Sequence, residues 1–220
     1  MDNSHSPTRE EIFLVARKLV NALNKLKLSC CLFGSTACVL NGVMRIPNDV
    51  DMIVMTESLD QEALKRLVVG CDRSFYLLPS GKVGETDTML YSGLEGVMSN
   101  GYKRRCRVDI FVPQTLNLPI IPQCRIETID NLPVLPLFPL LLLKLQAWSV
   151  HHNAKRKKYK QYVDIVDLAQ LHEIARDKGV RLHYAQWLPD SFLDPAVKCI
   201  QRYVQCYGKP DDWRRIGFDI

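Results

Sequence analysis

The sequence of 220 residues lacks the features that identify a secreted, membrane-spanning or repetitive protein. Its longest apolar run, Leu137 to Leu143, contains a proline and is too short to span a bilayer. The N-terminal stretch 1–11 is polar and has no apolar core of the kind found in secretion signals. The chain has no internal repeat and no low-complexity segment. We therefore expect a soluble protein of the cytoplasm that has no membrane partner.

The eight cysteines lack the spacing of a metal finger. Cys30 and Cys31 lie in a strand pattern and the other six are scattered, which is typical of reduced thiols rather than of a disulfide framework. His151 and His152 are adjacent but have no third ligand at metal spacing, so we expect them at a helix end.

A strong excess of one charge is also missing, since the chain has 29 basic and 24 acidic residues and a net charge of +5. This mild positive charge fits a polyanionic partner such as a nucleotide or RNA without requiring one. The length allows one large domain or two small ones.

The stretch 33–54 carries the strongest chemical signal. A buried strand ends at Gly34 and Ser35, a short helical run follows, and a second strand contains Asp49 and Asp51. Side chains two residues apart on a strand point to the same side, so these carboxylates lie together and need a compensating cation. Oxygen ligands alone favour Mg²⁺.

Hydrophobic periodicity predicts helices and strands in the first part of the chain and helices alone in the second. The expected helices are 8–26, 36–41, 61–69, 137–150, 159–177 and 192–207. The expected strands are 30–33, 49–54, 75–78, 89–92, 105–112, 126–129 and 132–135, with Gly81, Gly84, Gly93 and Gly96 in loops. We predict an α/β (α+β) fold, in which residues 1–136 form a mixed β-sheet flanked by helices and residues 137–220 form a helical C-terminal part.

Asp109 is the one carboxylate in an otherwise apolar strand, where it is costly unless something binds it. Together with Asp49 and Asp51 it is expected to hold two divalent metal ions, and it is a candidate proton acceptor. The turn at Gly34 and Ser35 is expected to bring backbone N–H groups close to a phosphate.

This pattern, GS followed after thirteen residues by DVD and later by VDI, resembles the nucleotidyltransferase superfamily typified by DNA polymerase β. The segments GSTACVL and RIPNDVD are most similar to the AbiEii and MenT branch, the minimal transferases of bacterial toxin–antitoxin systems. The similarity continues in LLLLKLQAW, which contains Lys144, and in KQYVDIVDL, which contains Lys160, Asp164 and Asp167. It covers roughly residues 30 to 172.

The resemblance implies a nucleotidyltransferase fold and transfer of a nucleoside monophosphate from an NTP to an acceptor hydroxyl, with release of pyrophosphate. It implies two Mg²⁺ or Mn²⁺ ions and nucleotide binding by Gly34, Ser35, Lys144, Lys160 and Asp164. The acceptor stays open among RNA or tRNA, protein and small molecules such as aminoglycosides, and so do the nucleotide preference and the oligomeric state.

Plainer interpretations exist for several of these residues. Ser35 is also a candidate N-cap of the helix that follows it. Lys144 fits a lysine that extends from an apolar helix to solvent. Lys160 and Asp164 have the spacing of a helical ion pair, while a second interpretation has Asp164 orient Lys144 or Lys160 toward the nucleotide. Because Val163 stands where the family has a basic residue, either lysine is a candidate to meet the triphosphate.

The basic residues near these motifs are less specific. We favour a solvated loop for 155–158 over a phosphate contact. The basic residues that lead into the Asp109 strand fit either an acceptor channel or an ordinary exposed strand start; they are Lys103, Arg104, Arg105 and Arg107. A rival function is a non-catalytic relative that binds nucleotide, RNA or a protein partner, but the presence of all three carboxylates argues against it.

Overall fold

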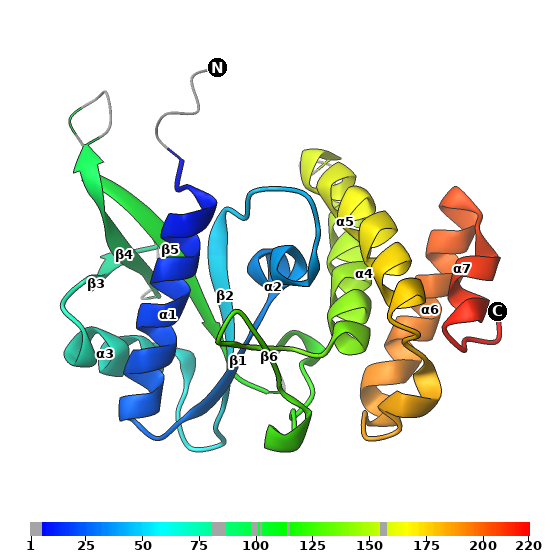
Figure 1. The fold of residues 1–220 in the computed structure, drawn as a ribbon, viewed down its shortest axis with the longest axis horizontal. Helices are drawn as coiled ribbons and strands as arrows, with labels where there is room; N and C mark the ends of the chain where they lie inside the picture. Colours follow the sequence, from blue (N-terminus) through cyan, green and yellow to red (C-terminus); the bar gives the residue numbers. More distant parts are fainter. Residues whose placement is uncertain (1–5, 81–86, 98–100, 102, 114, 155–157) are drawn as a thin grey trace.

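The computed structural model describes residues 6–80, 87–97, 101, 103–113, 115–154 and 158–220. Its elements combine one sheet with helices on both sides (Figure 1). The strands are β1 (Ser29–Phe33), β2 (Asp49–Met55), β3 (Phe75–Pro79), β4 (Thr88–Val97), β5 (Lys103–Phe111), β6 (Glu127–Ile129) and β7 (Leu132–Val134). The α-helices are α1 (Arg9–Lys25), α2 (Gly34–Asn41), α3 (Gln61–Cys71), α4 (Leu137–Asn153), α5 (Lys158–Asp177), α6 (Asp190–Tyr207) and α7 (Pro210–Arg215).

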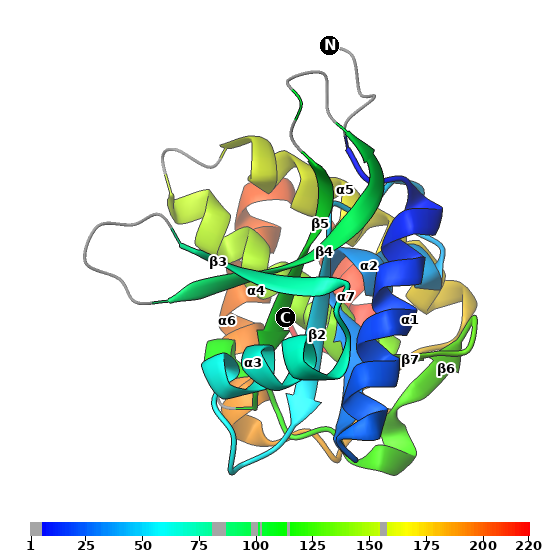
Figure 2. The same cartoon turned by 90° about the vertical axis from the view of Figure 1, so that its left-hand side faces the viewer.

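The seven strands form one mixed sheet in the order β3-β4-β5-β2-β1-β7-β6. Neighbours in sequence pair antiparallel, as β1 does with β2, whereas β2 pairs parallel with β5. Figure 2 shows β3 and β4 at the opposite edge of the sheet from β6 and β7. The predicted mixed sheet flanked by helices is confirmed.

The helices form layers on this sheet because their apolar sides are buried. Thr8 starts α1 through a capping box with Glu11, and the apolar side of the helix packs on the strands. Helices α1 and α3 lie on one side of the sheet, while α2 packs on β1 and β2 and joins the sheet to α4 (Figure 1). Helix α4 packs in turn against α5 and α6. The subdomain boundary at residue 136 stays a prediction.

Glycines 93 and 96 lie inside β4, so their placement in loops was wrong. The register of β4 against β5 shifts between Gly93 and Val97, and Gly96 has a φ of +84°. Glycine tolerates such an irregularity within a strand, which explains why it looked like a loop signal. Gly81 and Gly84 lie outside the described residues.

The remaining differences are at helix ends. Helix α2 begins at Gly34, two residues earlier than expected, and α4 continues to Asn153. Helix α7 was not predicted from the sequence. Lys158 opens α5, while the rest of the basic run 155–158 lies outside the described residues. Among the described residues, no helix combines the length and apolar character needed to cross a membrane.

Candidate active site

The junction between β1 and α2 brings the backbone unusually close to β2. Phe33 is paired with Asp51 in the antiparallel ladder, and Gly34 follows with a φ of +59°. A Cβ atom at residue 34 would lie 2.0 Å from Oδ2 of Asp51 and 2.8 Å from its Cγ. Glycine is therefore required at this position both by its backbone conformation and by the approach of the Asp51 side chain.

The first turn of α2 is tied to the start of β2 by hydroxyl groups. The Ser35 Oγ donates to Asp49 Oδ1 at 3.1 Å, and the Thr36 Oγ1 donates to the Asp49 carbonyl oxygen at 2.7 Å. Ser35 is not the N-cap of α2, because that position belongs to Phe33, which makes no side-chain cap bond. The capping interpretation was wrong, because the helix begins at Gly34, before Ser35, and the Ser35 hydroxyl bonds Asp49 instead.

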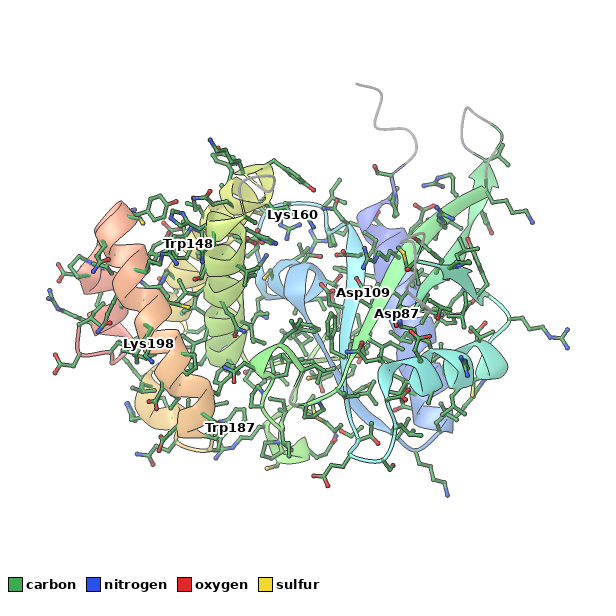
Figure 3. All side chains as sticks on the ribbon, turned by 180° about the vertical axis from the view of Figure 1, so that it is seen from behind. Asp87, Asp109, Trp148, Lys160, Trp187 and Lys198 are labelled. Atoms are coloured by element: carbon green, nitrogen blue, oxygen red, sulfur yellow. The ribbon has the colours of Figure 1, made fainter. Side chains whose placement is uncertain are left out.

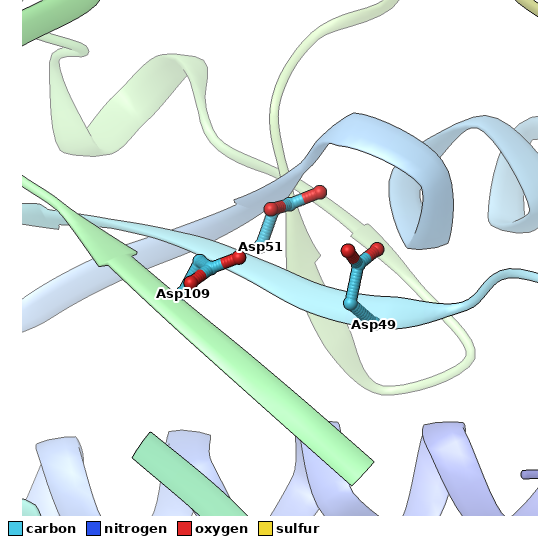
Figure 4. A group of neighbouring side chains, drawn as sticks. All are labelled: Asp49, Asp51 and Asp109. Atoms are coloured by element: carbon cyan, nitrogen blue, oxygen red, sulfur yellow. The ribbon is translucent and has the colours of Figure 1, made fainter. Parts of the chain in front are cut away.

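The three predicted acidic residues converge. Parallel pairing aligns Asp51 of β2 with Asp109 of β5, and Asp49 lies two residues before Asp51 on the same face. Each of the three side chains offers a carboxylate oxygen that lies within 4.8 Å of the other two (Figure 4). Asp109 thus lies on the same side of the sheet as its two partners.

The electrostatics of this cluster favour a bound cation. Burial raises the pKa of Asp51 to about 8, and the charges of Asp49 and Asp109 add to this effect. Burial also raises the pKa of Asp109, although the neighbouring Arg107 opposes this. Three carboxylates with so little neutralising charge fit a divalent cation bound by oxygen ligands.

Arg107 is the cation nearest to the acidic cluster. Its Nε and Nη2 donate to Oδ1 of Asp109 at 3.0 and 2.9 Å. Both bonds end on the same carboxylate oxygen, so in the described contacts Oδ2 of Asp109 has no arginine partner. The sequence carried a signal for this contact, since residues 107 and 109 share a strand face.

A second charged network lies on helices α4 and α5. The Lys144 Nζ lies 2.7 Å from Asp167 Oδ2 and 3.1 Å from Asp164 Oδ1. Arg45 makes two bonds to Asp167 through Nε and Nη2, at 2.7 and 2.8 Å. The His151 Nδ1 lies 2.5 Å from the second oxygen of Asp164. Each buried carboxylate is therefore shared by two nitrogen-bearing side chains.

The network favours the charged forms of Lys144 and Asp167. Burial alone would lower the pKa of Lys144, but Cys38 and the carboxylates of Asp167 and Asp164 raise it to about 12. Burial would raise the pKa of Asp167, but hydrogen bonds and charge from Arg45 and Lys144 lower it. Lys144 thus remains a cation although only 9% of its surface is exposed.

One cavity of about 550 Å³ brings both clusters together between the sheet and helices α4 and α5. Figure 3 labels Asp109 on β5 and Lys160 on α5, which line it from different elements. All eight residues predicted for the site line this cavity: Gly34, Ser35, Asp49, Asp51, Asp109, Lys144, Lys160 and Asp164.

His151 and Arg45 are among the cavity residues that were not predicted for the site. His151 was expected only at a helix end, yet it lines the cavity and contacts Asp164. Its position seven residues after Lys144 on the same helix was an available signal, because such residues share a face. Arg45, which lies four residues before Asp49, also lines the cavity. Among the described residues, the ion pairs do not include one between Lys160 and Asp164.

No protein-family model matches the sequence, and the comparison with curated proteins gives no match. The structure is similar to that of an antigenic nucleotidyltransferase-like protein from Paracoccidioides brasiliensis, with a TM-score of 0.63 and 15% identity. This similarity covers 97% of the present chain and 95% of the fungal one. The chain therefore has a nucleotidyltransferase fold.

Two further solved structures are less similar. One is a candidate nucleotidyltransferase from Thermotoga maritima, with a TM-score of 0.42, 16% identity and coverage of 73% of this chain and 99% of that one. The other is ANT(2")-Ia in complex with adenylyl-2"-tobramycin, with a TM-score of 0.45, 14% identity and coverage of 88% and 99%. Both scores are below 0.5, so neither of these two structures is used to support the fold.

Proposed function

We propose that this chain is a metal-dependent nucleotidyltransferase that transfers a nucleoside monophosphate from an NTP to an acceptor hydroxyl. The observation that supports it most is the convergence of Asp49, Asp51 and Asp109 in the wall of a cavity that also contains Lys144. A cluster of carboxylates beside buried and exposed cations suits a ligand that is itself a polyphosphate with bound metal.

Asp49 and Asp51 would hold two divalent ions, Mg²⁺ or Mn²⁺, and Asp109 would complete the second site. When bound, the ions supply positive charge to the phosphate oxygens and lower the pKa of the attacking hydroxyl. The acceptor oxygen attacks the α-phosphorus while the bond from that phosphorus to the oxygen bridging to the β-phosphate breaks. Pyrophosphate leaves with the bonding electron pair, and the carboxylate of Asp109 helps to accept the hydroxyl proton.

The other cavity residues bind and position the nucleotide in this proposal. In this proposal the backbone N–H groups of the turn at Gly34 and Ser35 face a phosphate. The absence of a side chain at Gly34 lets the Asp51 carboxylate lie against this turn, and Ser35 orients Asp49 through its hydroxyl. Asp164 positions Lys144 through their 3.1 Å contact. Lys160 lines the cavity from an exposed position and is the more accessible of the two lysines.

The experiment that tests the proposal incubates the protein with each α-labelled NTP, with Mg²⁺ or Mn²⁺, and with either total RNA or an aminoglycoside as acceptor. We expect label on one acceptor and its loss by about 10²-fold or more in Asp51→Asn. Asp177→Asn is the matched control, since the Asp177 side chain is 69% exposed. Circular dichroism checks that both variants are folded.

The outcomes separate the proposal from its rival. Unchanged transfer in Asp51→Asn would show that the acidic cluster is not the reaction centre. NTP binding without label on any acceptor or on the protein itself, and without release of pyrophosphate, would favour the non-catalytic binding module instead. Assignment to the AbiEii and MenT branch and location in the cytoplasm are further parts of the proposal. A cognate antitoxin encoded beside this chain would support the first.

A further inference from the structure

The face of the sheet that carries Asp109 continues beyond the cavity onto β5, β4 and β3. Alternate residues of β5 point to this face, so Lys103, Arg105 and Arg107 lie on the same side as Asp109. The ladder places Tyr91 of β4 opposite Arg107, and Tyr76 of β3 opposite Tyr91. Four side chains thus form one row of aromatic and basic groups, which we name the β-face cluster: Tyr76, Tyr91, Arg105 and Arg107.

The contacts within the β-face cluster confirm that its side chains share one face. The rings of Tyr76 and Tyr91 are stacked with centroids 6.1 Å apart. The guanidinium carbon of Arg105 lies 4.3 Å from the centroid of the Tyr91 ring. Arg107 reaches Asp109 at 2.9 Å and connects the cluster to the acidic residues.

The opposite faces of these strands are different in character. Cys106, Val108 and Leu90 are fully buried there, beneath the layer that contains α3. On the β-face, Arg105 and Arg107 are exposed and the two tyrosines are half-buried. In the described part of the chain, the ion pairs include neither Lys103 nor Arg105. The β-face cluster therefore presents stacked aromatic rings beside Arg105, which makes no ion pair among the described residues, and beside Arg107, which is paired with Asp109.

Stacked aromatic rings and arginine planes beside free cations are what single-stranded nucleic acids bind, because every base has a π-face and every linkage a negative charge. We propose that the β-face cluster binds the single-stranded 3′ end of an RNA acceptor and directs its terminal hydroxyl to Asp109. This inference rests on the proposed transferase function and names its acceptor class. RNA is favoured because recognition of RNA by proteins is concentrated on single-stranded loops and ends.

The direction of the RNA follows from the order of charges along β5. The basic residues precede Asp109 on β5, and Lys103 is six residues before Asp109, which is about 20 Å at the rise of a strand. The exposed Asp87 precedes β4 at the other end of the β-face, on the far side of the Tyr91–Arg107 pair from Lys103. A strand of a few nucleotides therefore runs from Asp109 toward Lys103, away from Asp87.

Binding of a labelled single-stranded RNA oligonucleotide, measured by fluorescence anisotropy in EDTA and without NTP, tests this surface separately from catalysis. We expect Arg105→Glu to weaken the Kd by about tenfold or more, and Tyr91→Leu by about tenfold. Arg105→Ala should reduce the slope of log K against log salt by about 0.7. Arg66→Glu is the matched control, because Arg66 is equally exposed on α3, on the other side of the sheet, and should change the Kd by less than about twofold.

Three results would overturn the inference. The first is no binding of RNA by the unaltered protein, and the second is equal weakening by Arg105→Glu and Arg66→Glu. The third is equal or tighter binding of DNA of the same sequence, or displacement of RNA by polyglutamate at matched charge. Circular dichroism of each variant excludes loss of fold as the cause.

NTP binding and label transfer in the presence of Mg²⁺, measured on the same preparations, separate this inference from the proposed function. Label transfer to a small acceptor without RNA binding would contradict the inference and support the transferase function. RNA binding that depends on Arg105, with no transfer from any NTP, would support the RNA-binding surface and contradict the transferase function.

Discussion

The Cα of Gly34 lies so close to Asp51 that a single added methyl group would occupy the position of the carboxylate. A Cβ at residue 34 would be 2.0 Å from Oδ2 of Asp51, far inside van der Waals contact. The backbone of Gly34 also has a φ of +59°, which disfavours other residues. The start of α2 and the position of Asp51 on β2 therefore depend on each other.

We expect Gly34→Ala to abolish transfer because it displaces the Asp51 side chain. It should also lower the free energy of unfolding by about 1–2 kcal/mol through its positive φ alone. Gly179→Ala is the matched control, since Gly179 has a φ of +64° and an added Cβ would have no neighbour within 4 Å. Urea denaturation and label transfer are measured on both variants. Retained transfer in Gly34→Ala, at a stability equal to that of Gly179→Ala, would contradict the close contact.

Asp167 holds the second charged network together. It is fully buried and is bonded to both Arg45 and Lys144. Removing it leaves two cations without their shared partner, so we expect Asp167→Ala to lower the free energy of unfolding by about 3–5 kcal/mol. Asp177→Ala should change it by less than about 1 kcal/mol, because Asp177 is exposed. Equal effects in urea denaturation would show that the network does not stabilise the fold.

The acidic residues could be predicted from the sequence because their geometry is local. Asp49 and Asp51 are two residues apart on one strand and therefore share a face, and Asp109 is the one carboxylate in an apolar segment. The same rule places Arg107 beside Asp109, although the sequence alone did not distinguish this role from an exposed strand start. Short-range periodicity thus gave the strands and the faces of their side chains.

The network around Asp167 could not be predicted in the same way. Arg45 and Asp167 are separated by 122 positions, and no periodicity within either segment relates them. Helix α7 has six residues, too few to repeat an apolar pattern. In β4, glycines accommodate the shift in register between Gly93 and Val97, so this part of the strand has a composition typical of a loop. These features depend on how distant segments pack.

The two cavity lysines should respond differently to substitution. Lys160 is exposed and, in the part of the chain that the structure describes, the ion pairs do not include it. We therefore expect Lys160→Ala to weaken NTP binding about tenfold, which is ~1.4 kcal/mol, without changing the thermal midpoint. Lys198→Ala on the exposed side of α6 is the control (Figure 3).

Lys144→Ala should lower both NTP affinity and stability, because Lys144 bridges Asp164 and Asp167. Fluorescent NTP binding and thermal unfolding measure the two effects separately. If Lys160→Ala binds NTP as tightly as Lys198→Ala does, Lys160 does not contact the triphosphate.

His172 provides the expected pH dependence of stability. Its ring packs at 4.2 Å against Trp213, and neither ring nitrogen has a hydrogen-bond partner among the described residues. Burial lowers the pKa of His172 to about 4 from its ordinary value of 6.5, while Asp212 raises it and Lys209 lowers it further. Between these two pKa values the unfolded chain binds the proton and the folded chain does not, so the folded state becomes less stable as the pH falls from about 6.5 to about 4.

Between pH 7 and pH 5 the shift at His172 predicts a loss of about 2 kcal/mol in the free energy of unfolding. His172→Phe keeps a ring against Trp213 but cannot bind a proton, so its stability should fall less over the same interval. His183→Phe is the control, since His183 is exposed and its substitution should leave the pH dependence unchanged. Urea denaturation at closely spaced pH values measures all three proteins. Parallel curves for His172→Phe and the unaltered protein would mean that the buried imidazole does not control acid sensitivity, since its removal is the only titrating change between them.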